Sequence, residues 1–186
     1  MIIIGITGSI ASGKTTVAQL IGKKKYPIFS ADKFVQKLYK NPYFINLLIK
    51  KFNLNNKKNI KKQIKTLIKK DKKKLLTLES VIHPRVRKEM KNFFKKKNKI
   101  LVLEIPLLIE STLSKYFDII IFVDAKKKLR LKRYLKNIND QEIFEILNKH
   151  QLTPIIKKKF CDLVINNNYS LTRLKKNVKQ FTDKYE

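Results

Sequence analysis

The sequence begins with IIIGITGSIASGKTT at residues 2–16, and the rest of the chain can be understood from this stretch outward. Its unbroken apolar run up to Gly5 is typical of a buried strand. The window GSIASGKT at 8–15 then fits the pattern G-x-x-x-x-G-K-[ST] without a mismatch. Val17 and Ile21 follow at helical spacing. A strand that leads through a glycine loop into a helix predicts a loop that binds nucleotide phosphates.

Each part of this loop has a chemical task in binding ATP. Gly8 and Gly13 allow backbone angles that turn successive N–H groups toward a phosphate. Lys14 is expected to reach the β- and γ-phosphates, and the Thr15 hydroxyl is expected to ligate Mg²⁺. The helix that begins near Lys14 adds the positive end of its dipole. The predicted ATP-binding residues are Gly8, Ser9, Ile10, Ala11, Ser12, Gly13, Lys14, Thr15 and Thr16.

Length and composition indicate a single compact domain. The chain has 186 residues, and its hydrophobic content of 43% is enough for one core. It lacks a run of about eighteen apolar residues, so we expect no transmembrane helix and no membrane partner. The first residues carry neither a basic leader nor a small-residue cleavage site, so we expect no signal peptide. The single cysteine, Cys161, cannot form an internal disulfide, and a cytoplasmic location is the default expectation.

The net charge of +30 raises the alternative of a nucleic-acid-binding protein. Arginine accounts for only five of the 44 basic residues, whereas proteins that read phosphates or base edges favour its planar guanidinium. The lysines are spread over every expected helix, and Lys, Ile, Asn and Phe are abundant together, as in proteins from AT-rich genomes. We therefore expect a solvated basic surface with weak, salt-sensitive attraction for anions, and no specific nucleic-acid partner.

Apolar strands alternate with helical stretches along the chain, which predicts a parallel sheet covered on both faces. After the first strand, further strands are expected at 26–29, 100–103, 119–123 and 163–165. The helix-rich stretch of about 42–97 is too long for a simple crossover and predicts a helical lobe beside the sheet. Within it, Asp71 is expected to cap a helix, and Pro84 predicts a kink or break near His83.

Five short blocks resemble the dephospho-coenzyme A kinase family. They are GSIASGKTT at 8–16, SADK around Asp32, LESVIHPRV around His83, LEIPLLIES at 103–111 and CDLVINNN at 161–168. The blocks occur in the order of the family and at about its separations. Many kinases share the phosphate loop, but the pairing of IHP with IPLLIES is much more specific to this family.

The resemblance implies a three-layer P-loop kinase fold with a five-stranded parallel sheet and helices on both faces. It implies one domain with a core of about 1–40, 98–136 and 160–186, a helical substrate lobe of about 42–97 and a lid of about 137–159. The implied activity is Mg-ATP-dependent phosphorylation of the ribose 3′-hydroxyl of dephospho-coenzyme A. ATP and dephospho-coenzyme A are then the expected partners, and the chain is expected to be a monomer or a weak homo-oligomer.

Two other functions stay open at this point. The first is another small-molecule or nucleoside-monophosphate P-loop kinase, because the phosphate loop does not identify the acceptor. The second is an RNA-binding protein that uses ATP as a switch, which the net charge motivates. Tight, sequence-selective RNA binding at physiological salt would favour the second.

Asp32 is the residue expected to act on the acceptor hydroxyl. It lies just beyond the C-terminal end of a predicted strand, at the edge where open α/β sheets bind ligands. A carboxylate there can orient a hydroxyl and accept its proton. The matching aspartate of the resembled family contacts the acceptor and is its proposed base. The alternative is an aspartate stabilised by a helix dipole.

Residues of the IHP and IPLLIES blocks are expected near the substrate or the metal. His83 either binds substrate or satisfies a buried backbone group. Glu104 either faces Mg²⁺ or its waters, or is a solvated carboxylate. Pro106 and Leu107 are expected to pack under the acceptor. Glu110 either caps a helix or anchors a lid residue, with a structural role favoured.

Basic residues after the fourth strand are expected to neutralise the phosphoryl group. Arg133 matches a recurrent family arginine and is expected to be catalytic, whereas Arg130 stands where the family commonly has glutamine. In the lid, a family arginine falls at about Asn137, and the basic positions after Gln151 are lysines at 157–159. Lysine supplies charge without the bidentate fork of arginine, so lid closure is expected to be weaker.

Cys161 and the asparagines at 166–168 lie on either side of the last expected strand. Cys161 has no partner pattern for reactivity and is expected to be a small buried residue. The asparagines at 166–168 either contact adenine through their backbone or form a turn.

Overall fold

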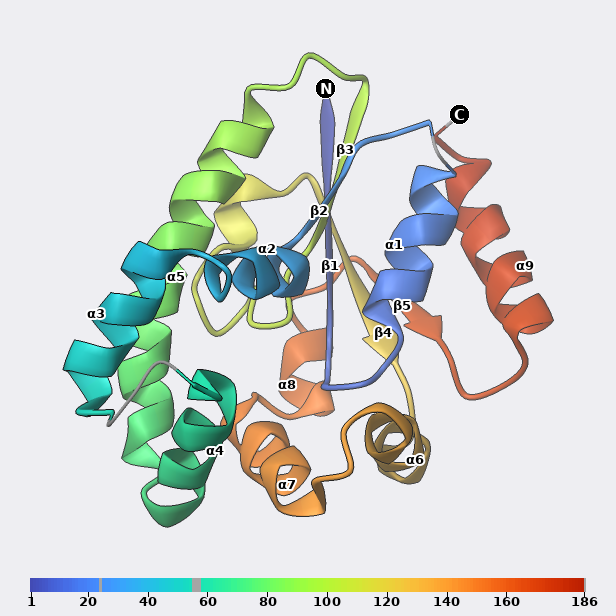
Figure 1. Cartoon of the computed structure of the whole chain (residues 1–186). Helices are drawn as coiled ribbons and strands as arrows, with labels where there is room; N and C mark the ends of the chain where they lie inside the picture. Colours follow the sequence, from blue (N-terminus) through green and yellow to red (C-terminus); the bar gives the residue numbers. More distant parts are fainter. Residues whose placement is uncertain (24, 55–57, 186) are drawn as a thin grey trace. The chain divides into compact units, whose positions relative to one another are not determined.

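In the computed structural model, which describes residues 1–23, 25–54 and 58–185, the chain divides into two compact units (Figure 1). The first comprises Met1–Ser30 and Phe94–Glu186 and contains the sheet. The second, Ala31–Phe93, is helical. We call them the sheet unit and the helical unit. The predicted division into core, substrate lobe and lid stays a prediction.

Five parallel strands form the sheet, in the order β2-β3-β1-β4-β5. They are β1 (Ile2–Gly8), β2 (Ile28–Ser30), β3 (Ile100–Glu104), β4 (Ile119–Asp124) and β5 (Leu163–Asn166). This confirms the predicted five-stranded parallel sheet. Because β1 is the central strand, the loop that follows it lies in the middle of the carboxyl edge, where open α/β sheets bind ligands.

The second strand begins later than predicted. The expected strand at 26–29 is wrong at its start, because β2 covers only Ile28–Ser30. Pro27 has no N–H to donate to a ladder. Its carbonyl accepts a hydrogen bond from Val102 N over 3.1 Å. Pro27 therefore makes one bond to β3 as an acceptor and cannot donate a second. Tyr26 is buried in the core without being part of the strand.

Helices α1 (Lys14–Gly22) and α9 (Leu171–Thr182) lie side by side on one face of the sheet (Figure 1). Alternate residues of the strands point toward this face, as the two-residue period of a strand requires. The core on this face contains Ile4, Ile6, Val17, Ile21, Ile121, Val123, Leu174 and Val178. Burial of these side chains is the main force that holds both helices to the sheet.

The opposite face is covered by the chain that follows β3 and by α8 (Pro154–Lys158). A Cβ atom at Gly5 would lie 2.7 Å from Leu108 and 2.8 Å from Phe117, so only glycine lets these side chains approach β1. On α8, the ammonium of Lys158 lies 5.8 Å from the ring centre of Phe122, which is fully buried in β4. Helices therefore lie on both faces of the sheet, as predicted.

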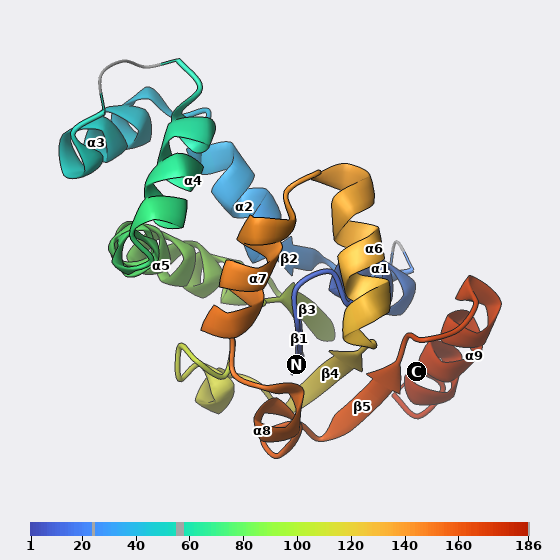
Figure 2. The same ribbon diagram turned by 90° about the horizontal axis from the view of Figure 1, so that it is seen from below.

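Helices α6 (Lys127–Asn137) and α7 (Gln141–His150) pack against each other after β4 (Figure 2). The rings of Tyr134 and Phe144 meet at 5.4 Å between centroids. The side chain of Asp140 accepts a hydrogen bond from Ile143 N over 3.2 Å and caps α7. A short 3₁₀ helix at Ser114–Tyr116 and the five-residue α8 were not predicted, since neither is long enough to show a helical period.

The helical unit consists, in its described part, of α2 (Ala31–Leu38), α3 (Pro42–Phe52), α4 (Ile60–Lys70) and α5 (Lys73–Phe94). Its core is lined by Phe44, Leu48, Phe52, Ile60, Ile64, Ile68 and Leu75. Asp71 accepts a hydrogen bond from Lys73 N over 2.9 Å, which confirms the predicted cap. The Asn- and Lys-rich tract at 53–59 has no apolar period and is expected to be a loop, and it lies partly outside the described residues.

Of the kink or break predicted near His83, the break is wrong and the kink stays a prediction. Helix α5 continues through Pro84 from Lys73 to Phe94. A proline inside a helix removes one backbone N–H and crowds the preceding turn. The carbonyl that loses its backbone donor is that of Ser80, four residues before Pro84; at the next position the guanidinium of Arg85 donates to the carbonyl of Val81 over 2.6 Å. Among the described residues, no helix is both long enough and apolar enough to cross a membrane.

Candidate active site

The end of β1 and the loop of residues 9–13 that follows it leave little room for side chains at Gly8 and Gly13. A Cβ atom at Gly8 would lie 2.6 Å from the carbonyl oxygen of Val123. Gly13 has φ 97°, and a Cβ atom there would lie 2.2 Å from Nδ2 of Asn167. Gly8 is therefore required by its close approach to the backbone of β4, and Gly13 is required by its left-handed backbone.

Lys14 folds back over this loop. Its side chain is only 6% exposed, and Nζ donates to the carbonyl oxygens of Ser9 over 3.1 Å and Gly8 over 3.3 Å. The ammonium is thus held beside the loop by backbone carbonyls. A positive charge held beside successive backbone N–H groups at a helix N-terminus makes a site for phosphate anions.

Thr15 and Glu104 bring the loop and the end of β3 together. Thr15 Oγ1 donates to Glu104 Oε1 over 2.6 Å. The carboxylate of Glu104 is buried at 1% exposure, and its second oxygen, Oε2, has no hydrogen-bond partner among the described residues. Oxygen atoms from a hydroxyl and a carboxylate are the ligands that Mg²⁺ prefers, directly or through water. The unsatisfied Oε2 therefore fits a hydrated divalent cation beside Thr15.

Asn167 and Arg133 hold the far side of the loop. The side chain of Asn167 donates from Nδ2 to the carbonyl of Ser12 over 2.8 Å. The guanidinium of Arg133 donates to Asn167 O over 2.9 Å and to Ser12 O over 3.5 Å. Asn167 N in turn donates to Asp124 O over 2.7 Å. These bonds tie the loop to β4 and to the residues after β5, and the predicted phosphate-binding role of Arg133 stays a prediction.

Arg130 is a buried support of the loop. Its Nε donates to Ala125 O over 3.0 Å, and its NH1 nitrogen donates to Ile10 O over 3.2 Å and to Asn148 Oδ1 over 2.8 Å. The guanidinium lies 5.9 Å from the ring centre of Phe144. Burial lowers the pKa of Arg130, with Asp124 acting in the opposite direction. The structure thus assigns its donors to neighbouring oxygens of the protein, which favours a structural role for Arg130.

Lys157, the first of the three lid lysines at 157–159, lies inside the protein beside a carboxylate. Its side chain is fully buried, and Nζ pairs with Glu110 Oε1 over 2.8 Å and donates to Pro106 O over 2.9 Å. Burial lowers the pKa of Lys157, and its hydrogen bond to Glu110 opposes this shift. Glu110 Oε1 also accepts from Leu152 N over 3.0 Å. This confirms that Glu110 anchors a residue of the predicted lid.

The neighbouring lysine is also held by a carboxylate. Lys158 Nζ lies 2.6 Å from Asp124 Oδ2, with both side chains partly exposed. Lys159 is exposed to solvent. The three consecutive lysines therefore have three different environments, although they look equivalent in the sequence.

Cys161 is half-buried beside Lys157. Its Sγ donates to Lys157 O over 3.2 Å, and burial raises the pKa of the thiol to about 11. We expect Cys161 to react with a thiol reagent at pH 8 about 100-fold more slowly than an ordinary cysteine, because the reactive thiolate is rarer by that factor. The rate should rise as the pH approaches 11. Following the reaction spectrophotometrically across pH, with the guanidinium-unfolded chain as control, tests this; equal rates at pH 8 would contradict it.

The expected acceptor-side residues lie in different parts of the chain. Asp32 is exposed in the first turn of α2, and His83 is half-buried in α5. Pro106 and Leu107 are half-buried after β3, and the Pro106 carbonyl also accepts from Thr7 Oγ1 over 3.1 Å. The substrate-binding roles of these residues stay predictions.

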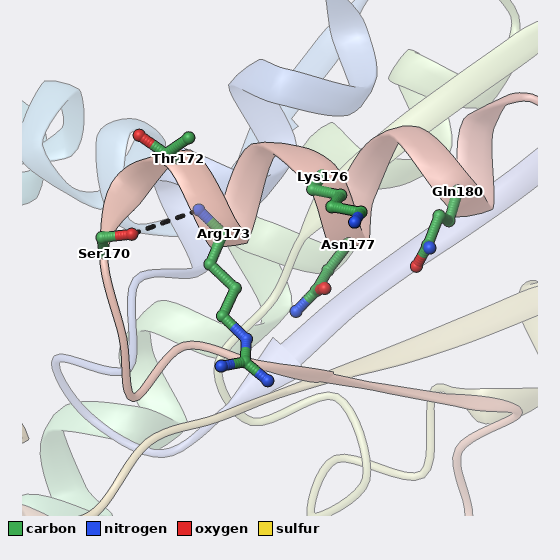
Figure 3. A pocket seen from close by; sticks show the side chains of 6 residues that line it. All are labelled: Ser170, Thr172, Arg173, Lys176, Asn177 and Gln180. Carbon is green, nitrogen blue, oxygen red and sulfur yellow. Dashed lines mark hydrogen bonds between the residues drawn. The ribbon is translucent and has the colours of Figure 1, made fainter.

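A shallow pocket of about 490 Å³ lies over α9 (Figure 3). It is lined by Ser170, Thr172, Arg173, Lys176, Asn177 and Gln180. Ser170 is the N-cap of α9 and accepts a hydrogen bond from Arg173 N over 3.3 Å. None of the predicted site residues lines this pocket. Within 1–23, 25–54 and 58–185, no group of three or more His, Cys, Asp or Glu side chains could hold a metal ion.

Three supporting residues of the loop were not singled out from the sequence. They are Gln151, Asn148 and Asn167, whose side chains bond Ile10 N, Arg130 and Ser12 O. Asn167 was noted only as one of three asparagines at a turn. The available signal was its position after the last strand of a parallel sheet, where the chain returns to the ligand-binding edge.

Known proteins of one family are similar to this chain over nearly its whole length. The family model described as dephospho-CoA kinase matches residues 2–173. The dephospho-CoA kinase of Fusobacterium nucleatum subsp. nucleatum is 34% identical over 191 residues, covering 98% of each chain. That of Bartonella quintana is 37% identical over 180 residues, covering 92% of this chain and 91% of the relative. The solved dephospho-CoA kinase from Campylobacter jejuni has a TM-score of 0.68 at 25% identity, covering 98% of this chain and 96% of that one.

Proposed function

This chain belongs to the dephospho-coenzyme A kinase family, and we propose that it carries out the family's reaction with the residue roles given below. It is an ATP-dependent kinase that phosphorylates the ribose 3′-hydroxyl of dephospho-coenzyme A. The products are coenzyme A and ADP, in the last step of coenzyme A biosynthesis.

The phosphate loop is proposed to bind the β- and γ-phosphates of ATP through Gly8 to Thr16. The observation that carries this role is the position of the Lys14 ammonium, which is held beside the loop by the carbonyls of Ser9 and Gly8. Backbone N–H groups and the N-terminus of α1 add fixed positive potential. Because these groups are already oriented, little reorganisation is needed when the phosphates arrive.

Thr15 and Glu104 would hold Mg²⁺ beside the phosphates. Their hydrogen bond of 2.6 Å and the unpaired Oε2 of Glu104 support this assignment. When bound, the metal would neutralise negative charge on the β- and γ-phosphates.

Asp32 is proposed to orient the ribose 3′-hydroxyl and to accept its proton. The hydroxyl oxygen forms a bond to the γ-phosphorus while the bond from that phosphorus to the bridging oxygen of ADP breaks. The proton passes to the carboxylate of Asp32, and ADP leaves with the electron pair of the broken bond. The chain position of Asp32, two residues after the end of β2, supports this role.

The remaining roles are proposed from the family blocks. Arg133 stabilises charge on the transferred group, and His83, Pro106 and Leu107 contact dephospho-coenzyme A. We also propose that the protein works in the cytoplasm as a monomer or weak homo-oligomer. The net charge of +30 supports weak self-association at most, because like-charged surfaces repel.

A coupled assay of ADP release with a panel of acceptors tests this function. The panel is dephospho-coenzyme A, AMP, dCMP and shikimate, each with Mg-ATP. We expect kcat/KM for dephospho-coenzyme A to exceed that for each other acceptor by at least about 100-fold, because its adenosine and pantetheine parts offer far more binding groups.

Omission of the acceptor is the matched control, since it measures background ATP hydrolysis. Preference for AMP or another member of the panel would overturn the assignment of the acceptor. It would leave the ATP-binding role of the loop intact.

A further inference from the structure

One residue of the phosphate loop other than glycine has a left-handed backbone. Ala11 has φ 57°, a conformation that L-residues with a side chain rarely adopt. It is the third residue of a turn closed by Ser12 N donating to Ser9 O over 3.1 Å. Glycine or asparagine is favoured at such a position. Contacts from outside the turn must therefore help to keep Ala11 in place.

The peptide group between Ser9 and Ile10 is held by three hydrogen bonds. Its carbonyl oxygen accepts from both Ser12 N and Lys14 Nζ, each over 3.1 Å. Its N–H donates to Oε1 of Gln151 over 2.8 Å. The amide of Gln151 thus holds the same rigid plane that carries the acceptor for the Lys14 ammonium, since a peptide group is planar.

The anchors come from one region outside the loop. Gln151 is the C-cap residue that directly follows α7, and that helix carries Asn148. Asn148 binds the guanidinium of Arg130, which donates to the carbonyl of Ile10. Side chains therefore bind both polar backbone groups of Ile10. Gln151 accepts from its N–H, and Arg130, itself bonded to Asn148, donates to its carbonyl.

We propose that Gln151 is a positioning residue for ATP: its side-chain oxygen orients the Ser9–Ile10 peptide and thereby keeps Ala11 left-handed and Lys14 beside the phosphates. The proposal rests on the ATP-binding role of the loop and adds a residue 141 positions away in the chain. Gln151 acts through the loop and does not touch the reacting atoms.

The test replaces Gln151 with methionine, which has a similar length and lacks the amide acceptor. Titration calorimetry with Mg-ATP in the absence of acceptor should show a Kd raised about tenfold, as expected for a lost hydrogen bond to a partly buried N–H group. The KM for ATP should rise by the same factor, and the KM for dephospho-coenzyme A should stay within about twofold. Gln141→Met, an exposed site on the same helix, is the matched control.

A second substitution separates this role from general destabilisation. Glycine at position 11 adopts positive φ without steric cost, so it no longer needs an external anchor. We expect Ala11→Gly, added to Gln151→Met, to lower the Kd for Mg-ATP at least about threefold relative to Gln151→Met alone. A double-mutant cycle measures this effect. Gln151→Asn, which keeps the amide and shortens its reach, should weaken ATP binding in the same direction if the methionine variant fails to fold.

An ATP Kd within twofold of the wild type for the Gln151 variants would overturn the proposal. So would an unchanged Kd on adding Ala11→Gly to Gln151→Met, because Gln151 would then act elsewhere. Failure of the proposed function is a separate result: a wild-type protein that binds ATP and does not phosphorylate dephospho-coenzyme A.

Discussion

Replacing Asp32 with asparagine is expected to lower kcat by about 10²–10⁴-fold and to leave ATP binding within about twofold of the wild type. The amide has nearly the shape of the carboxylate, so it can still contact a hydroxyl. It cannot accept the proton that the ribose oxygen loses when it bonds to phosphorus. The phosphate loop has hydrogen bonds of its own, from Lys14 Nζ to the carbonyls of Gly8 and Ser9 and from Asn167 Nδ2 to Ser12 O.

Single-turnover phosphorylation of dephospho-coenzyme A and calorimetric titration of Mg-ATP together measure this effect. Asp183→Asn is the matched control, since it makes the same chemical change at an exposed residue at the end of α9. A turnover of Asp32→Asn near the wild-type value would show that Asp32 is not the base. Loss of ATP binding would show that Asp32 acts on the nucleotide and not on the acceptor.

Lys157→Met is expected to destabilise the folded protein by about 3–5 kcal/mol, because it leaves the carboxylate of Glu110 without its charged partner. The ammonium is fully buried and bonded to Glu110 and to the Pro106 carbonyl. Glu110 already has one buried oxygen, Oε2, without a hydrogen-bond partner among the described residues. Loss of Lys157 would therefore leave this carboxylate without a cation, with the hydrogen bond from Leu152 N still in place.

Chemical and thermal unfolding measure this change, and the midpoint temperature should fall by about 6–20 °C. Replacing both partners, Lys157→Met with Glu110→Leu, should restore most of the stability, since a well-packed apolar pair avoids the desolvation of both charges. Lys159→Met is the control at an exposed position two residues away. A single variant as stable as the wild type would mean that Lys157 contributes no net stability.

Local patterns were enough for most of the fold. Strands β1, β3 and β4 are long apolar runs, so their existence and type could be read directly. The caps at Asp71 and Asp140 were also predictable, because a capping side chain and the N–H that it bonds lie within three residues. Two boundaries were predicted wrongly. The start of β2 depends on its pairing with β3, and α5 continues through Pro84 although proline disfavours a helix.

The candidate site divides in the same way. The loop from Gly8 to Thr15 could be recognised because all its phosphate-binding groups are contiguous. Its supports could not be recognised, because Gln151 and Asn167 reach it from positions 141 and 155 residues away. Neither residue type has a spacing that would point to a loop so far along the chain.

By itself, the sequence determined the strand-loop-helix unit, the alternation of strands and helices, and the blocks that identify the kinase family. These depend on periodicity and on groups that are neighbours along the backbone. Only the tertiary structure decided which of three consecutive lysines is buried against Glu110, and which amide holds the Ser9–Ile10 peptide. Such choices depend on burial and on hydrogen-bond geometry between distant segments, and both are fixed only once the strands are ordered in the sheet.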